Sequence, residues 1–328
     1  MFTASILLGE RGQLRPVYLC WEEEPAQVNV RPVEHGLTSL ETVMKSTIKL
    51  IALLFISSHV LAADLSVVYQ SASSTPLGNP HDLKLSPDGK YLFVSDVGNN
   101  RVVLLDPDTL AFVSAFGDDH QSGTHDVDFD AQGRAYVADT HNNRVTIYRM
   151  QGTRATLTGE LEGRMRGPEG VLIHSNGRVY VAGAWSGNVV AYEDGRVVRQ
   201  LGGLSSPHDL EEAADGNIWL SDSGNHRVLL VSPDLKILRE LSREKYGFNG
   251  VRYLDLLEDG TLVAADKNNH QIKFIAPDGT LLLVLGSGRR EEGPDKFATP
   301  EGVEIRGNTI WISDSGNDRV VKYTIKRQ

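Results

Sequence analysis

One stretch of the sequence decides the fold: residues 79–105 read NPHDLKLSPDGKYLFVSDVGNNRVVLL. An alternating segment followed by two apolar runs predicts three short β-strands. The turn residues Pro87-Asp88-Gly89 separate the first strand from the second. A fourth apolar segment follows at 112–116 and ends at Gly117. The stretch therefore predicts a unit of four short antiparallel strands.

This unit recurs along the chain six times. One position, at the end of the second predicted strand, marks each copy: Asp96, Asp139, Gly183, Asp222, Asp266 and Asp314. Neighbouring marks lie 39 to 48 residues apart, a period typical of four-stranded propeller blades. A single blade cannot bury both of its faces, so six units predict a closed ring.

The last unit lacks a fourth strand, because the chain ends at Gln328 soon after the third. The apolar residues 65–69 can supply the missing strand and remove the open edge. The sequence therefore predicts an all-β fold over residues 63–328. It is a six-bladed β-propeller with four antiparallel strands per blade, closed by the N-terminal strand of the mature chain.

The segment before the repeats has the pattern of a secretory signal peptide. Residues 44–62 contain the basic residues Lys45 and Lys49, an apolar block and a small residue at Ala62. We expect cleavage there, an exported protein that begins at Ala63, and a periplasmic or secreted location. Residues 1–43 are interpreted as a non-native or disordered extension, since they show no apolar periodicity.

Composition excludes several classes of partner. The net charge of −10 argues against nucleic acid, whose phosphates need a basic surface. No run of eighteen apolar residues exists, so no membrane span is expected. The single cysteine, Cys20, precedes the signal segment, so the mature chain should contain no disulfide.

The first strand of each blade lines the central channel, so the residues that open it should form a ring at one mouth. Across the six units this position reads His81, His125, Glu169, His208, Asn249 and Glu301. The following position reads Asp82, Asp126, Gly170, Asp209, Gly250 and Gly302. Strand packing does not require histidine at this position, so the ring is predicted to be the functional mouth.

Two interpretations of the ring remain open. In the first, His125, His208 and Glu301 from alternate blades bind zinc or ferrous iron, with His81 beside them. The neighbouring Asp82, Asp126 and Asp209 would then hold a second, hard cation such as calcium. In the second, the mouth is polar and water-filled, and its groups bond to one another.

A second pattern, Asp-x-x-Asn-x-Arg, stands intact in four units. Its members are Asp96/Asn99/Arg101, Asp139/Asn142/Arg144, Asp222/Asn225/Arg227 and Asp314/Asn317/Arg319. Asp and Asn can satisfy backbone donors of the loop, and the Arg can bridge carboxylates, so a structural role is expected. The pattern resembles the NHL repeat, and the resemblance covers residues 64–328.

Within that group, the His-Asp pairs are similar to those of the peptidyl-hydroxyglycine amidating lyases. The resemblance implies zinc held by three such histidines, calcium at an adjoining Asp, and a catalytic tyrosine in a loop between second and third strands. His125 and His208 match two of the zinc positions, and Glu301 stands at the third. Trp185 stands where the tyrosine is expected.

The loops beside the ring add candidate ligand contacts: Trp185, His141, Lys267, Tyr246 and Phe248. Aromatic and charged groups around a polar channel suit a small organic molecule or a peptide end. The sequence is therefore compatible with two functions. One is an exported scaffold that binds a small molecule, a peptide or a protein at the mouth. The other is a metal-dependent lyase or lactonase-like enzyme that uses zinc or calcium at the same place.

Overall fold

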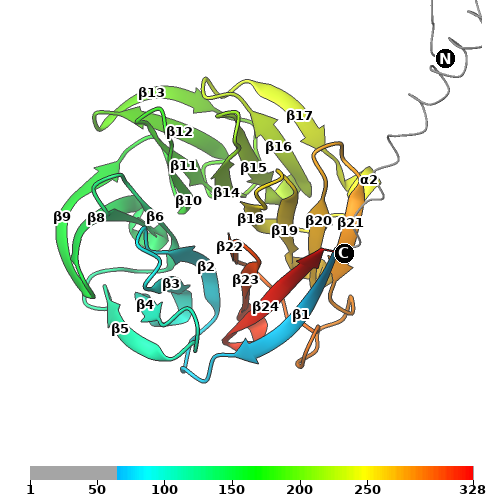
Figure 1. Ribbon diagram of the computed structural model, residues 1–328. Coiled ribbons are helices and arrows are strands. Elements are labelled where there is room, and N and C mark those ends of the chain that lie inside the picture. Colours follow the sequence, from blue (N-terminus) through cyan, green and yellow to red (C-terminus); the bar gives the residue numbers. More distant parts are fainter. Residues whose placement is uncertain (1–64, 328) are drawn as a thin grey trace, which may run out of the picture. The chain divides into compact units, whose positions relative to one another are not determined.

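The computed structural model describes residues 65–327, and these form six four-stranded antiparallel sheets arranged as propeller blades (Figure 1). The predicted fold class is confirmed. The predicted signal peptide at 44–62 and the extension at 1–43 lie outside the described residues. No helix among the described residues is long and apolar enough to cross a membrane.

The first three blades follow the predicted units closely. Blade one contains β2 (Pro80–Leu85), β3 (Leu92–Asp96), β4 (Arg101–Leu105) and β5 (Phe112–Phe116). Blade two contains β6 (Thr124–Phe129), β7 (Arg134–Asp139), β8 (Arg144–Gln151) and β9 (Arg154–Glu162). Blade three contains β10 (Pro168–Ile173), β11 (Val179–Gly183), β12 (Asn188–Glu193) and β13 (Arg196–Leu201).

In the other three blades the strand order is the same, but a short helix lies between blades four and five. Blade four contains β14 (Pro207–Glu212), β15 (Ile218–Asp222), β16 (Arg227–Val231) and β17 (Ile237–Leu241), and a short helix, α2 (Arg243–Tyr246), follows it. Blade five contains β18 (Val251–Leu256), β19 (Leu262–Asp266), β20 (Gln271–Ile275) and β21 (Leu281–Leu285). Blade six contains β22 (Val303–Arg306), β23 (Thr309–Asp314) and β24 (Arg319–Arg327).

The outer strand of blade six comes from the N-terminal end of the described chain. β1 (Leu65–Ala72) pairs antiparallel with β24, and Figure 1 shows the two strands side by side. Tyr69 lies opposite Tyr323 in the ladder, and the two rings meet edge to face with their centroids 5.6 Å apart. The sheet of blade six therefore joins the first and last strands of the described chain.

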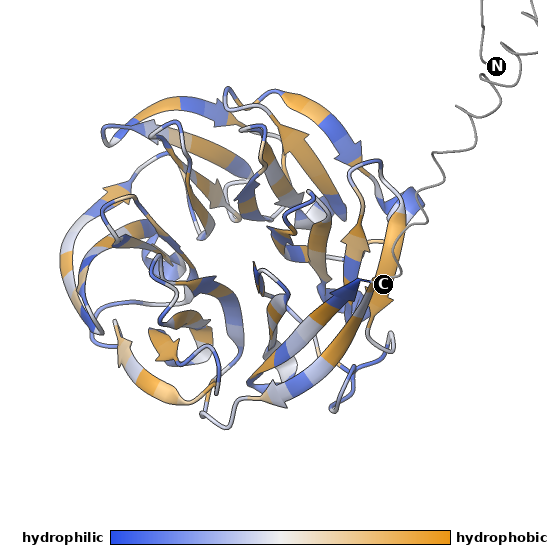
Figure 2. Cartoon of the chain, viewed as in Figure 1, coloured by the Kyte–Doolittle hydropathy of each residue, from blue (hydrophilic) through white to orange (hydrophobic). Residues whose placement is uncertain are grey.

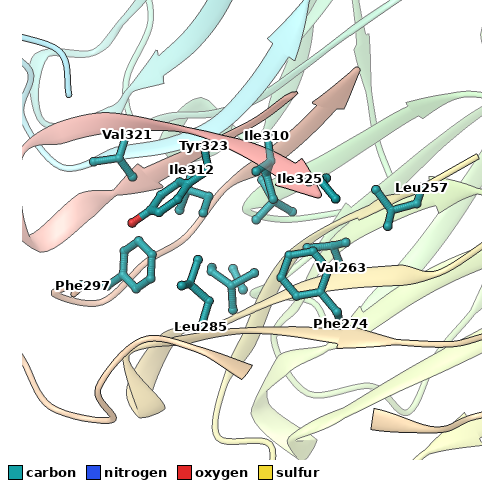
Figure 3. Packing of buried hydrophobic residues seen from close by; sticks show 13 residues of the cluster. Leu257, Val263, Phe274, Leu285, Phe297, Ile310, Ile312, Val321, Tyr323 and Ile325 are labelled. Atoms are coloured by element: carbon teal, nitrogen blue, oxygen red, sulfur yellow. The ribbon is translucent and has the colours of Figure 1, made fainter. Parts of the chain in front are cut away.

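The hydrophobic core lies between neighbouring blades rather than at the ring centre. Between blades five and six, for example, Phe274 and Val263 pack with Ile312 and Tyr323, and all four side chains are fully buried (Figure 3). Burying a large apolar side chain contributes about 1.5–3 kcal/mol. The outer strand β9, RATLTGELE, mixes hydrophobic and hydrophilic residues, as expected for one covered face and one solvated face (Figure 2).

The Asp-x-x-Asn-x-Arg pattern has the predicted structural role. In blade two the fully buried carboxylate of Asp139 accepts hydrogen bonds from Ser122 N–H at 2.7 Å, from Asn142 Nδ2 at 3.0 Å and from Arg144 Nε at 2.8 Å. The loop between second and third strands is thereby tied to the segment that precedes the first strand.

A second device, which the sequence analysis did not predict, joins neighbouring blades. The residue before each third strand adopts the left-handed conformation in five blades, with φ between 54° and 57°. Its side chain accepts a backbone N–H from the next blade. These residues are Asn100, Asn143, His226, His270 and Asp318, and their donors are Gly123, Gly167, Gly250, Thr299 and Asn79. The loops around the mouth are thus fixed to one another.

Candidate functional site

The innermost strands β2, β6, β10, β14, β18 and β22 surround the centre of the ring (Figure 1). The residues that occupy equivalent positions at their mouth ends are His81, His125, Glu169, His208, Arg252 and Glu301. We call this set the mouth ring. Five of its six members are those predicted from the sequence.

The prediction for blade five, Asn249 followed by Gly250, is wrong. Val251 pairs with Asp266, as Pro207 pairs with Asp222 in blade four, so Arg252 takes the ring position. Asn249 instead donates its N–H to Asp266 at 2.7 Å, a bond that other blades make three residues before their ring residue. The Asn-Gly pair therefore belongs to the preceding loop.

Spacing along the chain could have identified Arg252. The ring residues His125, Glu169 and His208 each stand fourteen residues before the marker position of their blade. Counting back fourteen residues from Asp266 gives Arg252, whereas Asn249 stands seventeen residues before it. The Asn-Gly pair resembles the Gly-containing pairs of other units, and the wrong prediction rested on this resemblance rather than on the spacing.

One half of the mouth ring is built around Glu169. His208 directs Nδ1 to the carbonyl oxygen of Ser206 at 2.8 Å, and its Nε2 contacts the Glu169 carboxylate. Both ring nitrogens of His208 are thus engaged by acceptors. Burial opposes ionisation of Glu169, but His208, His125 and Arg252 together hold the pKa of Glu169 well below its usual range. Glu169 is therefore an ionised, buried carboxylate in contact with His208.

The other half is built around Glu301, whose side chain is fully buried. Its carboxylate contacts Lys267 Nζ, lies 3.4 Å from Arg252 Nε and lies 3.8 Å from His81 Nε2. Burial would raise the pKa of Glu301, yet His81, Arg252 and Lys267 lower it to about 2. Glu301 is therefore ionised at neutral pH and lies between the cations Arg252 and Lys267.

His81 and His125 meet edge to face, with ring centroids 4.6 Å apart. Burial, which Glu301 partly offsets, lowers the pKa of His81 to about 3, and burial likewise lowers the pKa of His125, so neither ring is charged at neutral pH. His125 Nδ1 is 2.8 Å from both Gly123 O and Thr140 Oγ1, which leaves its Nε2 free of these contacts. His81 Nδ1 is buried without a hydrogen-bond partner in the described part of the chain.

A tyrosine forms the floor beneath the mouth ring. Tyr253 is fully buried, and its hydroxyl donates to the carbonyl oxygens of His125 at 2.9 Å and Glu169 at 2.8 Å. Blade five lies opposite blade two in a six-bladed ring, so the phenol crosses the channel. Burial and the nearby carboxylates raise the pKa of Tyr253 well above its ordinary value, so it remains a donor.

Farther along the same inner strands lies a layer of carboxyl groups that we call the acidic layer. A cavity of about 10 Å³, roughly the room for one water, is lined by Asp82, Asp126, Asp128, Asp209, Glu211 and Glu304, with Lys84 as the cation among them. Several of these carboxyls accept an N–H from the next blade; Asp126, for example, accepts from Val171 at 2.6 Å and Asp209 from Leu254 at 2.6 Å. The layer therefore links blades.

The five predicted ligand contacts divide into two groups. Trp185, His141 and Lys267 lie at the mouth: Trp185 is 50% exposed, its ring stacks on His141 at 5.7 Å, and Lys267 contacts Glu301. The prediction for Tyr246 and Phe248 is wrong, because both are buried in the core between blades four and five. The turn made by α2 directs these rings inward, where they stack on each other.

The predicted metal ligands lie in the channel, but other contacts occupy the ligating atoms of His208 and Glu301. Both nitrogens of His208 are engaged, and the cations Lys267 and Arg252 flank Glu301. No group of three or more His, Cys, Asp or Glu side chains within residues 65–327 is arranged to hold a metal ion. As arranged, His125, His208 and Glu301 do not fit zinc. The zinc and calcium assignments stay predictions.

Comparison with known proteins supports the fold. Residues 125–148 match the NHL repeat. No curated protein sequence matches the chain. A catalytically inactive virginiamycin B lyase from Staphylococcus aureus, solved with quinupristin, superposes with a TM-score of 0.58 at 14% identity, over 79% of this chain and 99% of that one.

Two proteins from Bacteroides thetaiotaomicron are also similar in structure. A protein of unknown function gives a TM-score of 0.64 at 15% identity, over 80% of this chain and 76% of that one. An auxiliary nutrient binding protein gives 0.62 at 15% identity, over 76% and 70%. At such identities the likeness concerns the fold. The described chain is thus a six-bladed β-propeller with an NHL repeat in its second blade.

Proposed function

We propose that this propeller is an exported binding protein that holds a small organic molecule or a peptide end in the mouth ring. One observation carries the proposal. Seven buried side-chain atoms within residues 65–327 make no hydrogen bond, and two of them, His81 Nδ1 and Arg252 Nε, lie in the mouth ring beside Glu301, whose carboxylate contacts Lys267. Buried polar atoms are normally paired. Two such atoms in the mouth ring favour a ligand that supplies partners.

The rim of the mouth offers a surface for the body of such a ligand. Trp185 is half exposed, and its ring stacks on His141, so the exposed part of the indole can contact a ligand. Pockets for small molecules commonly combine an aromatic wall with a few convergent polar groups. The nutrient-binding protein from Bacteroides thetaiotaomicron shares this fold, which is compatible with a binding role.

A ligand screen on the mature protein tests the proposal. Compounds that raise the melting temperature are re-measured by calorimetry on the wild type, on W185A and on F112A. Phe112 is the matched control, because it is 53% exposed but lies on the outer strand β5. We expect W185A to weaken binding and F112A to leave it unchanged. Equal binding by all three proteins would contradict a site at the mouth.

Export is the second part of the proposal, and it rests on residues 44–62. Mass spectrometry of the protein recovered from outside the cytoplasm should find Ala63 as the first residue. A mature form that retains residues 1–43 would contradict both the cleavage site and the interpretation of that extension.

A second candidate function, a lyase or lactonase-like enzyme, is favoured by the state of His125. A neutral imidazole whose Nδ1 is held by a carbonyl and whose Nε2 is free is suited to accept a proton. A lyase is also among the similar structures. Metal analysis separates the candidates: stoichiometric zinc or calcium, lost in H125A, would favour the metal-dependent enzyme over the binding protein.

A further inference from the structure

Two of the five residues whose side chains tie neighbouring blades together are histidines. His226 lies directly before β16 and ties blade four to blade five, and His270 lies directly before β20 and ties blade five to blade six. The other three ties use Asn100, Asn143 and Asp318 at the same position. Blade five is therefore held on both of its sides by a histidine.

In both histidine ties the ring nitrogen Nδ1 is the acceptor. His226 Nδ1 lies 2.9 Å from the backbone nitrogen of Gly250, and His270 Nδ1 lies 2.9 Å from that of Thr299. A ring nitrogen accepts a hydrogen bond only while it carries no hydrogen, so each bond requires the neutral imidazole. Protonation would place a hydrogen on Nδ1, and two donors would then face each other. The amide oxygen of an asparagine has no such second state near neutral pH.

Charged groups of both signs lie around the two rings. Burial, together with Arg290, lowers the pKa of His270, and Asp314 opposes this effect only in part. The tie made by His270 is therefore fully present above the ordinary histidine pKa of about 6.5 and is lost as pH falls through the lowered value. His226 shares a surface recess with Arg227, Glu240, Arg243 and Glu244. Arg227 and Glu240 pair with each other there at 2.9 Å.

The two ties hold the segments that lead into one side of the mouth ring. Gly250 comes two residues before Arg252, and Thr299 comes two residues before Glu301. The side chains of Arg252 and Glu301 face each other, with Nε 3.4 Å from Oε2. Release of both ties would therefore loosen two neighbouring members of the mouth ring at once.

We infer that His226 and His270 form a pH-sensitive switch, in which protonation of the two rings releases blade five from its neighbours at the mouth. Local opening of this kind needs only the loss of a few weak bonds, whereas the strands of the blade stay paired. The switch is a property of the fold, and it exists whether or not the mouth binds a ligand.

Amide hydrogen exchange, measured by NMR on the mature protein at about pH 7.5 and about pH 5, tests the switch. Each rate is divided by that of an unstructured peptide at the same pH, which removes the general effect of pH on exchange. The protection of the Gly250 and Thr299 amides should fall about fivefold in acid, the change that corresponds to one neutral hydrogen bond. Gly167 is the internal control, because its N–H is bound at 2.9 Å by the side-chain oxygen of Asn143. Its protection should stay constant.

The double variant H226N/H270N is the matched variant, since blades one and two use asparagine at this position. Asparagine tolerates the left-handed backbone, with φ of 56° at both residues, so the fold and the ties should be retained. Protection of Gly250 and Thr299 in this variant should be the same at both pH values. Thermal unfolding checks that the variant is folded, and H226N and H270N alone, each reporting on one tie, replace it if it is not.

Three results would overturn the inference. The first is protection of Gly250 and Thr299 that changes no more than that of Gly167. The second is a fall that persists in H226N/H270N, where no histidine remains in the ties. The third is the absence of protection already at neutral pH, because the ties would then be open without protonation. All of these measurements use the protein without ligand, so the screen with W185A and F112A decides the proposed binding function separately.

Discussion

Replacement of Tyr253 by phenylalanine tests the interpretation of this residue as a strut across the channel. The variant keeps the ring and removes one oxygen, so the packing around the ring should be retained. Its hydroxyl is the donor that the carbonyl oxygens of His125 and Glu169 share, at 2.9 Å and 2.8 Å. In the variant both buried carbonyls lose that donor, and blade five loses its link to blades two and three.

The size of the effect follows from the burial of these atoms. Tyr253 is 0% exposed, so water reaches the site only if the channel opens. Leaving a buried acceptor unsatisfied costs about 1–3 kcal/mol. We therefore expect the free energy of unfolding of Y253F to fall by about 2 kcal/mol, which corresponds to a melting temperature lower by about 4–8 °C in a domain of this size.

Urea and thermal unfolding of the mature protein provide the measurement. The control is Y91F, because Tyr91 is half-buried and its hydroxyl makes no hydrogen bond within residues 65–327. Y91F should change the free energy of unfolding by less than about 0.5 kcal/mol. A Y253F protein as stable as Y91F would show that Tyr253 does not link the blades, and the division of the channel into mouth and acidic layer would be refuted.

Three further predictions follow from the other contacts of the propeller. Burial raises the pKa of Glu304 to about 7 and that of Asp126 to about 6. The folded protein thus retains protons that the unfolded chain releases near pH 4. His81 and His125, whose pKa values burial lowers, act in the opposite direction, so the test compares the wild type with E304Q. Relative to E304Q, the free energy of unfolding of the wild type should fall as pH rises from about 4 to about 8 in urea titrations; a constant difference between the two proteins would contradict it. The free energy of unfolding of D139A should fall by about 3 kcal/mol, because Arg144 and Ser122 N–H lose their acceptor. The exposed control D118A should be almost as stable as the wild type. Deletion of residues 65–72 should destabilise the protein by several kcal/mol and promote aggregation, seen by thermal unfolding and size-exclusion chromatography, because β24 becomes an open edge; a stable monomer would argue against this role of β1.

The ring of candidate residues could be predicted from sequence in five blades out of six, because the strand and turn pattern keeps a nearly constant spacing there. Blade five departs from this pattern. α2 and the loop after it place an Asn-Gly pair where the ring residue and its following residue were expected. The ladder between Val251 and Asp266 places Arg252 at the ring position, as the constant spacing of fourteen residues also indicates, with Tyr253 directly after it. The same inserted segment places Tyr246 and Phe248 in the core between blades four and five. Their aromatic character alone did not indicate whether the rings point into the core or toward the mouth.

The number of blades, the class of fold, the structural use of the Asp-x-x-Asn-x-Arg pattern and the concentration of histidine at one end of the channel could be predicted from the sequence. These features are local or periodic, so each blade repeats the information. The tertiary structure decided which partners these side chains have. His208 pairs with Glu169, Glu301 with Lys267 and Arg252, and Tyr253 reaches opposite blades. Such contacts join residues from different repeats, and they depend on the distance across the ring, which the spacing along the chain does not encode.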